Sequence, residues 1–169
     1  METKEYKLTE DESRIWRTWY FGFEYVETAL NKALAKHGID SNELRILTLL
    51  IETPDNRLRM SDVAYGANRS PSRLSHTVTR MELRELVVRE PCADDRRGSW
   101  LVLTQKGEEV LQAALVERSK LVQEYFIDVI GQRDFAAIGR AMGKVLRANM
   151  PDYVRKISTP MEGWWPATR

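Results

Sequence analysis

This sequence has little of what marks secreted or membrane proteins. Its single cysteine, Cys92, excludes an internal disulfide framework and is typical of a reducing compartment. The longest stretch without a charged residue is eight residues, 98–105, whereas spanning a bilayer takes about 20 mostly apolar residues. No apolar stretch follows the charged start at 1–5, so we expect no secretory signal. The expectation is a cytoplasmic protein without a membrane partner.

Residues that carry catalysis are also scarce. Two isolated histidines, His37 and His76, and one cysteine make no cluster of metal ligands. The chain has no glycine-rich phosphate loop. Scattered serine, histidine and aspartate residues predict nothing unless a fold brings them together. We therefore expect no enzyme activity, no catalytic residue, no metal site and no cofactor.

The charge that is present is unevenly distributed. The net charge is +1, but residues 1–56 carry seven Lys/Arg against eleven Asp/Glu. Residues 57–106 carry ten against six, and nine of those ten cations are arginine. Residues 107–169 are close to neutral. A basic middle segment is the electrostatic footprint of a protein that binds a polyanion, although a charged face can also be simply solvated.

Apolar periodicity and capping residues predict a mainly helical chain with a small β-hairpin. Thr9 to Glu12 has the form of a capping box, and Gly38 is a suitable stop for the first helix. The expected elements are a helix from Thr9 to Gly38, a helix over 40–51 capped by residues 40–43 beginning with Asp40, a short strand over 58–60, a short helix capped by Ser61, a helix from Pro71 to about Arg84, strands 87–92 and 100–103 joined by a turn over 93–98, a helix capped by Thr104 that ends at Gly131, and a last helix capped by Asp134 that stops near Pro151.

Ser70-Pro71 is the sharpest local signal in the chain. Serine is a favoured N-cap, and proline is over-represented at the first helical position because its missing N–H would be unpaired there. A short helix, a tight link and this second helix form a helix-turn-helix, and the hairpin that follows is a wing. The expected fold class is therefore mainly α with a small β-wing, a winged helix-turn-helix.

The helix that starts at Pro71 has one apolar and one polar face. Leu74, Val78 and Met81 mark the apolar face, and the polar face has no acidic side chain before Glu82. Arginine side chains can donate paired hydrogen bonds to guanine or to phosphates, and small hydroxyl side chains let the helix backbone approach DNA closely. The backbone amides at the N-terminus of a helix favour a bound anion. We therefore expect the DNA-binding residues on this helix to be Ser70, Pro71, Ser72, Arg73, Ser75, His76, Thr79 and Arg80.

The predicted tip of the wing is also charged. Asp95 and Arg97 are two residues apart in a turn and can pair, which would hold one arginine rigid. Either Arg96 or Arg97 can then enter a narrow minor groove, whose negative potential attracts guanidinium groups.

Five segments in order resemble the multiple-antibiotic-resistance-regulator (MarR) family. They lie within residues 44–111 and read LRMSDVA (58–64), SPSRLS (70–75), ELVVR (85–89), CADDRRG (92–98) and LVLTQKG (101–107). The resemblance implies a homodimer formed by the terminal helices on a pseudo-palindromic double-stranded DNA operator, with recognition helices in successive major grooves. Residues 95–97 match the family's Asp-x-Arg wing, which assigns the minor groove to Arg97. One departure is at 83–86, where the family usually has glycine before the strand.

The resemblance also implies a division of the chain and a ligand-responsive repressor. We expect an N-terminal dimerisation helix over 1–38, a winged helix-turn-helix over 39–104, and C-terminal dimerisation helices with a tail over 105–169, in one structural domain. The expected effector is a small aromatic or phenolic molecule. Its pocket would be lined by Trp16, Trp19, Tyr20 and Phe23. Aromatic residues at helical spacing more often mark a core or a dimer stripe, and we favour that interpretation.

Two alternatives stand beside this interpretation. The first alternative is a DNA-binding redox sensor that acts through Cys92, because this cysteine lies beside a basic wing and reactive cysteines are typically found in electropositive surroundings. The family's peroxide sensors carry their reactive cysteine in the first helix, which has none here, and we favour a structural role for Cys92. The other is a winged-helix module that binds proteins without DNA, but such a module needs no arginine-rich recognition face.

Overall fold

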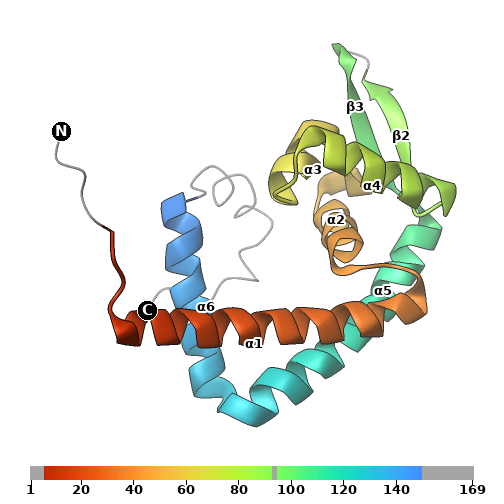
Figure 1. Cartoon of the computed structure of the whole chain (residues 1–169). Coiled ribbons are helices and arrows are strands. Elements are labelled where there is room, and N and C mark those ends of the chain that lie inside the picture. Colours follow the sequence, from red (N-terminus) through yellow and green to blue (C-terminus); the bar gives the residue numbers. More distant parts are fainter. Residues whose placement is uncertain (1–5, 93–94, 150–169) are drawn as a thin grey trace, which may run out of the picture.

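The computed structural model describes residues 6–92 and 95–149, and for residues 95–97 it describes the backbone alone. The elements follow the order expected from the sequence (Figure 1). They are α1 (Glu10–Leu34), α2 (Ser41–Ile51), β1 (Arg57–Arg59), α3 (Met60–Gly66), α4 (Pro71–Leu83), β2 (Val87–Cys92), β3 (Asp95–Leu103), α5 (Gln105–Val122) and α6 (Asp128–Asn149). Short 3₁₀ turns over Ala35–His37 and Pro54–Asn56 and a π-helical turn over Gln123–Ile127 connect some of them.

Capping side chains fix where the helices begin. At α1, Thr9 and Glu12 form the expected capping box, with each side chain accepting from the other's backbone N–H. Asp40 caps α2 in the same way, and Gly38 ends the preceding turn in the left-handed region at φ 71°. The predicted cap at Ser61 is wrong. The chain passes from extended to helical conformation at Arg59, which places Ser61 inside the first turn of α3.

The three strands form an antiparallel sheet in the order β1-β3-β2. The predicted turn over 93–98 is too long, because β3 already begins at Asp95. Pairing shifts from Pro91 opposite Ser99 to Cys92 opposite Asp95, so β3 carries three extra residues at this point. Such a bulge bends a strand without ending it, which is why a polar, glycine-containing segment can remain part of the strand.

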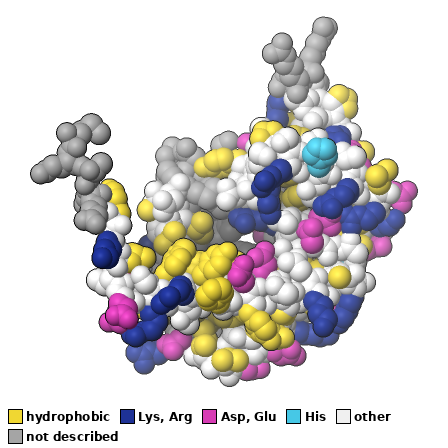
Figure 2. All heavy atoms as spheres, viewed as in Figure 1, with side chains coloured by type: hydrophobic (Ala, Val, Ile, Leu, Met, Phe, Trp, Pro, Cys, Tyr) yellow, Lys and Arg dark blue, Asp and Glu magenta, His cyan; other side chains and the backbone are white. Residues whose placement is uncertain are grey.

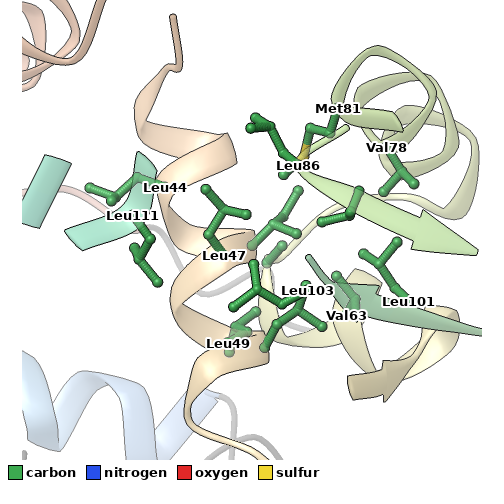
Figure 3. Packing of buried hydrophobic residues seen from close by; sticks show 14 of the residues in the cluster. Leu44, Leu47, Leu49, Val63, Val78, Met81, Leu86, Leu101, Leu103 and Leu111 are labelled. Carbon is green, nitrogen blue, oxygen red and sulfur yellow. The ribbon is translucent and has the colours of Figure 1, made fainter. Parts of the chain in front are cut away.

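The hydrophobic core lies between α2, α3, α4, the sheet and the first half of α5 (Figure 3). The predicted apolar face of α4 is confirmed, since Leu74, Val78 and Met81 are all buried. They meet side chains such as Leu47 of α2 and Leu101 of β3 in a single cluster of buried residues. This cluster fixes α4 with its opposite face toward solvent.

Long helices extend away from this core (Figure 1). In α1 only Leu34 is buried, and the rest of the helix is exposed or half-buried. The predicted break at Gly131 is confirmed by its φ of 75° and ψ of 162°. Asp134 lies three residues after that break, inside the helix, and so does not cap it as we predicted. Within the described ranges, no helix is both long and apolar enough to cross a membrane.

Candidate nucleic-acid interface

The solvent face of α4 carries the candidate residues. Ser70 caps the helix, because its Oγ accepts from the backbone N–H of Arg73 at 3.4 Å. All of the residues expected on this helix are exposed, namely Ser70, Pro71, Ser72, Arg73, Ser75, His76, Thr79 and Arg80. Figure 2 shows Lys and Arg side chains gathered over this part of the molecule. The helix therefore presents a basic surface opposite its buried face.

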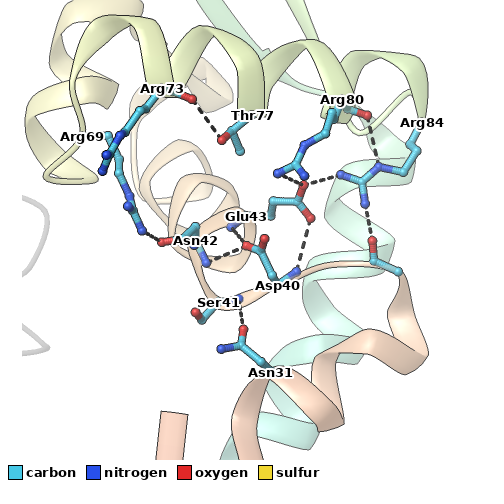
Figure 4. A network of polar contacts seen from close by, with 11 residues as sticks. Asn31, Asp40, Ser41, Asn42, Glu43, Arg69, Arg73, Thr77, Arg80 and Arg84 are labelled. Atoms are coloured by element: carbon cyan, nitrogen blue, oxygen red, sulfur yellow. Dashed lines mark hydrogen bonds and ion pairs between the residues drawn. The ribbon is translucent and has the colours of Figure 1, made fainter. Parts of the chain in front are cut away.

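One flank of α4 is fastened to α2. The carboxylate of Glu43 lies 2.5 Å from Nη2 of Arg84 and 3.7 Å from Nη2 of Arg80 (Figure 4). Arg80, predicted from the sequence as a DNA contact, thus has a partner inside the protein. Periodicity placed Arg80 on an exposed flank but gave no sign of Glu43, which lies on another helix.

The other flank of α4 is fastened to β2 by Arg89. Its Nη1 donates to Oε2 of Glu82 at 2.6 Å, and its Nη2 donates to the carbonyl oxygen of Ser75 at 3.0 Å. Oγ1 of Thr79 also accepts from Arg89 at 3.4 Å. Sequence reasoning did not single out Arg89, since its partners lie seven or more residues away. Ser75 and Thr79, which we expected to contact DNA, therefore also hold Arg89 of β2 against α4.

A basic groove of about 350 Å³ runs along the start of α4. Its floor is apolar, and Arg69, Arg73 and His76 line it together with Asn42 and Thr77. Arg69 donates to Oδ1 of Asn42, which fixes one guanidinium at the edge of the groove (Figure 4). Clustered guanidinium donors suit an anion such as a phosphate. Sequence reasoning did not single out Arg69. Its position in the link just before Pro71 was the one feature that could have indicated it.

Two arginines pack against Trp100 at the base of the wing, on the face of the sheet turned away from the core. The guanidinium groups of Arg57 and Arg59 each lie 5.0 Å from the ring centre of Trp100, a cation–π arrangement. The predicted side-chain roles of Asp95, Arg96 and Arg97 lie outside the described residues. The structure does place their backbone at the outer end of β3.

The aromatic residues expected to line an effector pocket form a row on the exposed side of α1. The rings of Trp16 and Trp19 are 5.3 Å apart, and those of Trp19 and Phe23 are 5.9 Å apart. With Tyr20 they remain between 38 and 56 % exposed, so within one chain they are not core residues. Figure 2 shows a patch of hydrophobic side chains over α1. A separate groove of about 430 Å³ on this helix is lined by Phe21, Glu24, Tyr25, Glu27, Thr28 and Asn31.

Cys92 is buried at the end of β2, with 7 % of its surface exposed. Redox-sensing cysteines are solvent-accessible, so burial favours the structural role. Among the residues that the structure describes, no three His, Cys, Asp or Glu side chains come together as a metal site would require.

A short helix, a tight link, an exposed basic helix and a hairpin define a winged helix-turn-helix protein. The family model described as "MarR family" matches residues 37–98. Among solved structures, AbsC from Streptomyces coelicolor is 36% identical with a TM-score of 0.77, and the match covers 86% of this chain and all of AbsC. Sco3205 from the same organism, solved in complex with DNA, is 30% identical with a TM-score of 0.82, covering 89% and 94% of the two chains. This chain belongs to the MarR family of transcriptional regulators.

A curated relative carries the same type of function. The HTH-type transcriptional regulator MhqR of Bacillus subtilis is 24% identical over 128 residues, which are 75% of this chain and 86% of MhqR. These relatives are transcription regulators and not enzymes.

Proposed function

We propose that this chain is a sequence-specific regulator of transcription that binds double-stranded DNA. The observation that carries the proposal is the solvent face of α4, which presents Arg73 and His76 with no exposed acidic side chain and is held rigid on both flanks. A rigid helix is what sequence reading requires, because base contacts depend on placing donors to within a fraction of an ångström. The complex of Sco3205 with DNA supports the proposal.

Five residues take roles that their positions suit. Arg73 and His76 reach base edges in the major groove from the first half of α4, and Ser72 lets the backbone approach closely. Arg69 binds a phosphate beside them, from the groove that it shares with Arg73. Arg97 enters the minor groove from the wing, as its match to the family pattern implies.

The unit that binds DNA spans residues 39–104, and the terminal helices form a dimerisation region. The buried cluster lies between Leu34 and Ala114, whereas the side chains of the aromatic row on α1 are 38–56 % exposed. A homodimer would place two α4 helices on the two halves of a pseudo-palindromic operator.

A salt titration tests the DNA-binding function. The equilibrium constant for a duplex should fall steeply with salt, since log K drops by about 0.9 per log unit of salt for each phosphate neutralised. Selection of bound duplexes from a random pool should then yield a preferred operator. A binding constant that does not change between about 50 and 200 mM salt would leave the module that binds only proteins as the better interpretation.

We also propose that the regulator releases its operator when a small aromatic or phenolic effector binds beside the row of Trp16, Trp19, Tyr20 and Phe23. Their stacked rings suit an aromatic ligand that binds where the row meets the second subunit of the proposed dimer. A screen of small phenolics should find a compound that changes tryptophan fluorescence and releases DNA at the same concentration. Release without a fluorescence change would place the effector elsewhere, and oxidant-driven release would point to Cys92.

A further inference from the structure

Glu43 is a buried carboxylate in the DNA-binding unit. It is 3 % exposed, and every other buried residue in the described ranges outside Cys92 and the glycines is a hydrocarbon or Met side chain. One oxygen lies against Arg84 and Arg80, and the other accepts from the backbone N–H of Asp40 at 3.2 Å. A buried charge is costly unless it is paired and hydrogen-bonded, and both conditions are met here.

Both arginine partners come from α4, but they differ in how much freedom they have. Arg84 is bound at three points, because it also donates to the carbonyl oxygens of Gly38 and Arg80. Arg80 has one ion-pair contact, at 3.7 Å, and 63 % of its side chain is exposed. Its guanidinium therefore lies close enough to the solvent face of α4 to reach a phosphate if Glu43 did not hold it.

The same carboxylate ties α4 to the start of α2, and that start is tied to α1. The backbone N–H of Ser41 donates to Oδ1 of Asn31 at 2.8 Å (Figure 4). The contacts thus run from α1 through the first turn of α2 to the second half of α4. The orientation of α4 is set relative to the helix through which we propose the dimer forms.

We propose that Glu43 is a positioning residue that holds Arg80 away from DNA and so sets the preference for operator over other sequences. The proposal rests on the DNA-binding function proposed above. An arginine that grips phosphates strengthens binding to all sequences alike, because phosphates carry no sequence information. Withholding Arg80 keeps non-specific affinity low, while Arg73 and His76 remain available to read bases.

The test compares Glu43→Gln, Arg80→Ala and the double variant with the wild-type chain. Glutamine keeps the size of Glu43 and one acceptor oxygen, which can accept from Arg84 or from Asp40 but not from both, and it lacks the charge that holds Arg80. Affinities for the selected operator and for a random-sequence duplex are measured by fluorescence anisotropy over a series of salt concentrations. Circular dichroism checks that each variant is folded.

We expect Glu43→Gln to bind the random duplex more tightly and to lower the ratio of operator to random affinity. Its salt slope should steepen by about 0.9 per subunit, one added phosphate contact. Arg80→Ala should leave the wild-type slope unchanged, and the double variant should return to that slope. A residue that served stability alone would weaken binding to both duplexes without steepening either slope.

Two results would overturn the proposal. One is a loss of about 0.9 in slope per subunit in Arg80→Ala, which would mean that Arg80 already contacts a phosphate in the wild type. The other is a folded Glu43→Gln with an unchanged slope and unchanged operator preference. If Glu43→Gln does not fold, the slope of Arg80→Ala still decides. A wild-type chain without salt-dependent binding would instead defeat the DNA-binding function itself.

Discussion

The arginines of α4 show what a single residue's sequence position can and cannot reveal. Helical periodicity put both Arg73 and Arg80 outside the buried stripe, and both are exposed. Their surroundings differ, since Arg80 faces Glu43 and Arg73 lines the groove beside Arg69. Glu43 precedes Arg80 by 37 residues, and no local pattern links positions so far apart. Residue type and exposure were therefore predictable, whereas partners contributed by other elements were not.

Arg73→Ala should weaken binding to the preferred operator by about 1–3 kcal/mol and relax preference at one base position per half-site. The physical reason is the loss of a forked donor near the start of a helix that enters the major groove. Competition binding against operators substituted at each position measures both effects. Arg14→Ala is the control, because Arg14 forms an exposed pair with Asp11 on α1 and such pairs contribute little. A uniform loss across all substituted operators would assign Arg73 to a phosphate instead.

The capping box of α1 makes a prediction about protonation. Hydrogen bonds from the backbone and hydroxyl of Thr9 lower the pKa of Glu12 below its usual range. Because the folded pKa is depressed, this contribution to helix stability is present above the ordinary pKa and disappears as pH falls through the lowered value. Thr9→Ala removes the hydroxyl but keeps the backbone N–H, so it should raise the pKa of Glu12 only part of the way to its usual range in an NMR titration.

Glu85 provides the control for that titration. The side chain of Lys106, 2.9 Å away, lowers the pKa of Glu85, and this pair lies far along the chain from Thr9. Its titration should be the same in the wild type and in Thr9→Ala. An unchanged pKa for Glu12 in the variant would show that the hydroxyl of Thr9 does not bond to Glu12 in solution.

At the scale of elements, local chemistry determined the helix starts better than the strand ends. Ser70, Thr104, Asp40 and Thr9 all cap the helices that the sequence assigned to them. These caps act within three residues, so a sequence pattern can reveal them, but the caps predicted at Ser61 and Asp134 were wrong because the chain turns helical before both residues. The bulge that keeps residues 95–98 in β3 depends on pairing with β2, and the π-helical turn before α6 has no comparable local signal.

The joint between the wing and α5 depends on Gly107. A Cβ there would lie 2.0 Å from the backbone oxygen of Leu86 and 2.9 Å from Cδ1 of Leu103. Gly107→Ala must push the start of α5 away from the hairpin, and overpacking of this kind costs on the order of 1–3 kcal/mol. Urea unfolding should report that loss as a lower midpoint.

Gly139 of α6 is the matched control for Gly107. A Cβ there meets nothing within 4 Å, so Gly139→Ala removes only chain freedom and should stabilise the helix by about 0.5–1 kcal/mol. Equal midpoints for the two alanine variants would mean that the wing and α5 are not in contact in solution.

At the scale of the whole molecule, packing and charge divide the chain in the same way. The buried cluster lies within residues 34–114, a range that includes the whole basic segment 57–106, and the long helices extend beyond it (Figure 1). The uneven distribution of charge and the long apolar stripes could be predicted from the sequence. The sequence could not show which stripe packs within the chain and which stays exposed, because both have the same helical period.

The open stripe on α1 predicts a stable dimer. This helix is about 38 Å long at about 1.5 Å per residue, and against the part of the chain that the structure describes Leu34 is its only buried residue. Exposed aromatic side chains in a continuous patch mark an interaction surface, and a two-fold dimer is the commonest arrangement that covers one. Sedimentation at micromolar concentration should therefore give twice the chain mass of 19.6 kDa.

Trp19→Glu places a charge in this row and should shift the dimer toward monomer, because an unpaired charge in an apolar interface is costly. The salt slope of DNA binding should then fall to about half, since each monomer brings one α4 and one wing. Val88→Glu adds the same charge to a 44 % exposed position on β2 and should leave sedimentation unchanged. A wild-type chain that sediments as a monomer, or a Trp19→Glu variant that stays dimeric with the full slope, would show that this row of aromatic residues does not hold the subunits together.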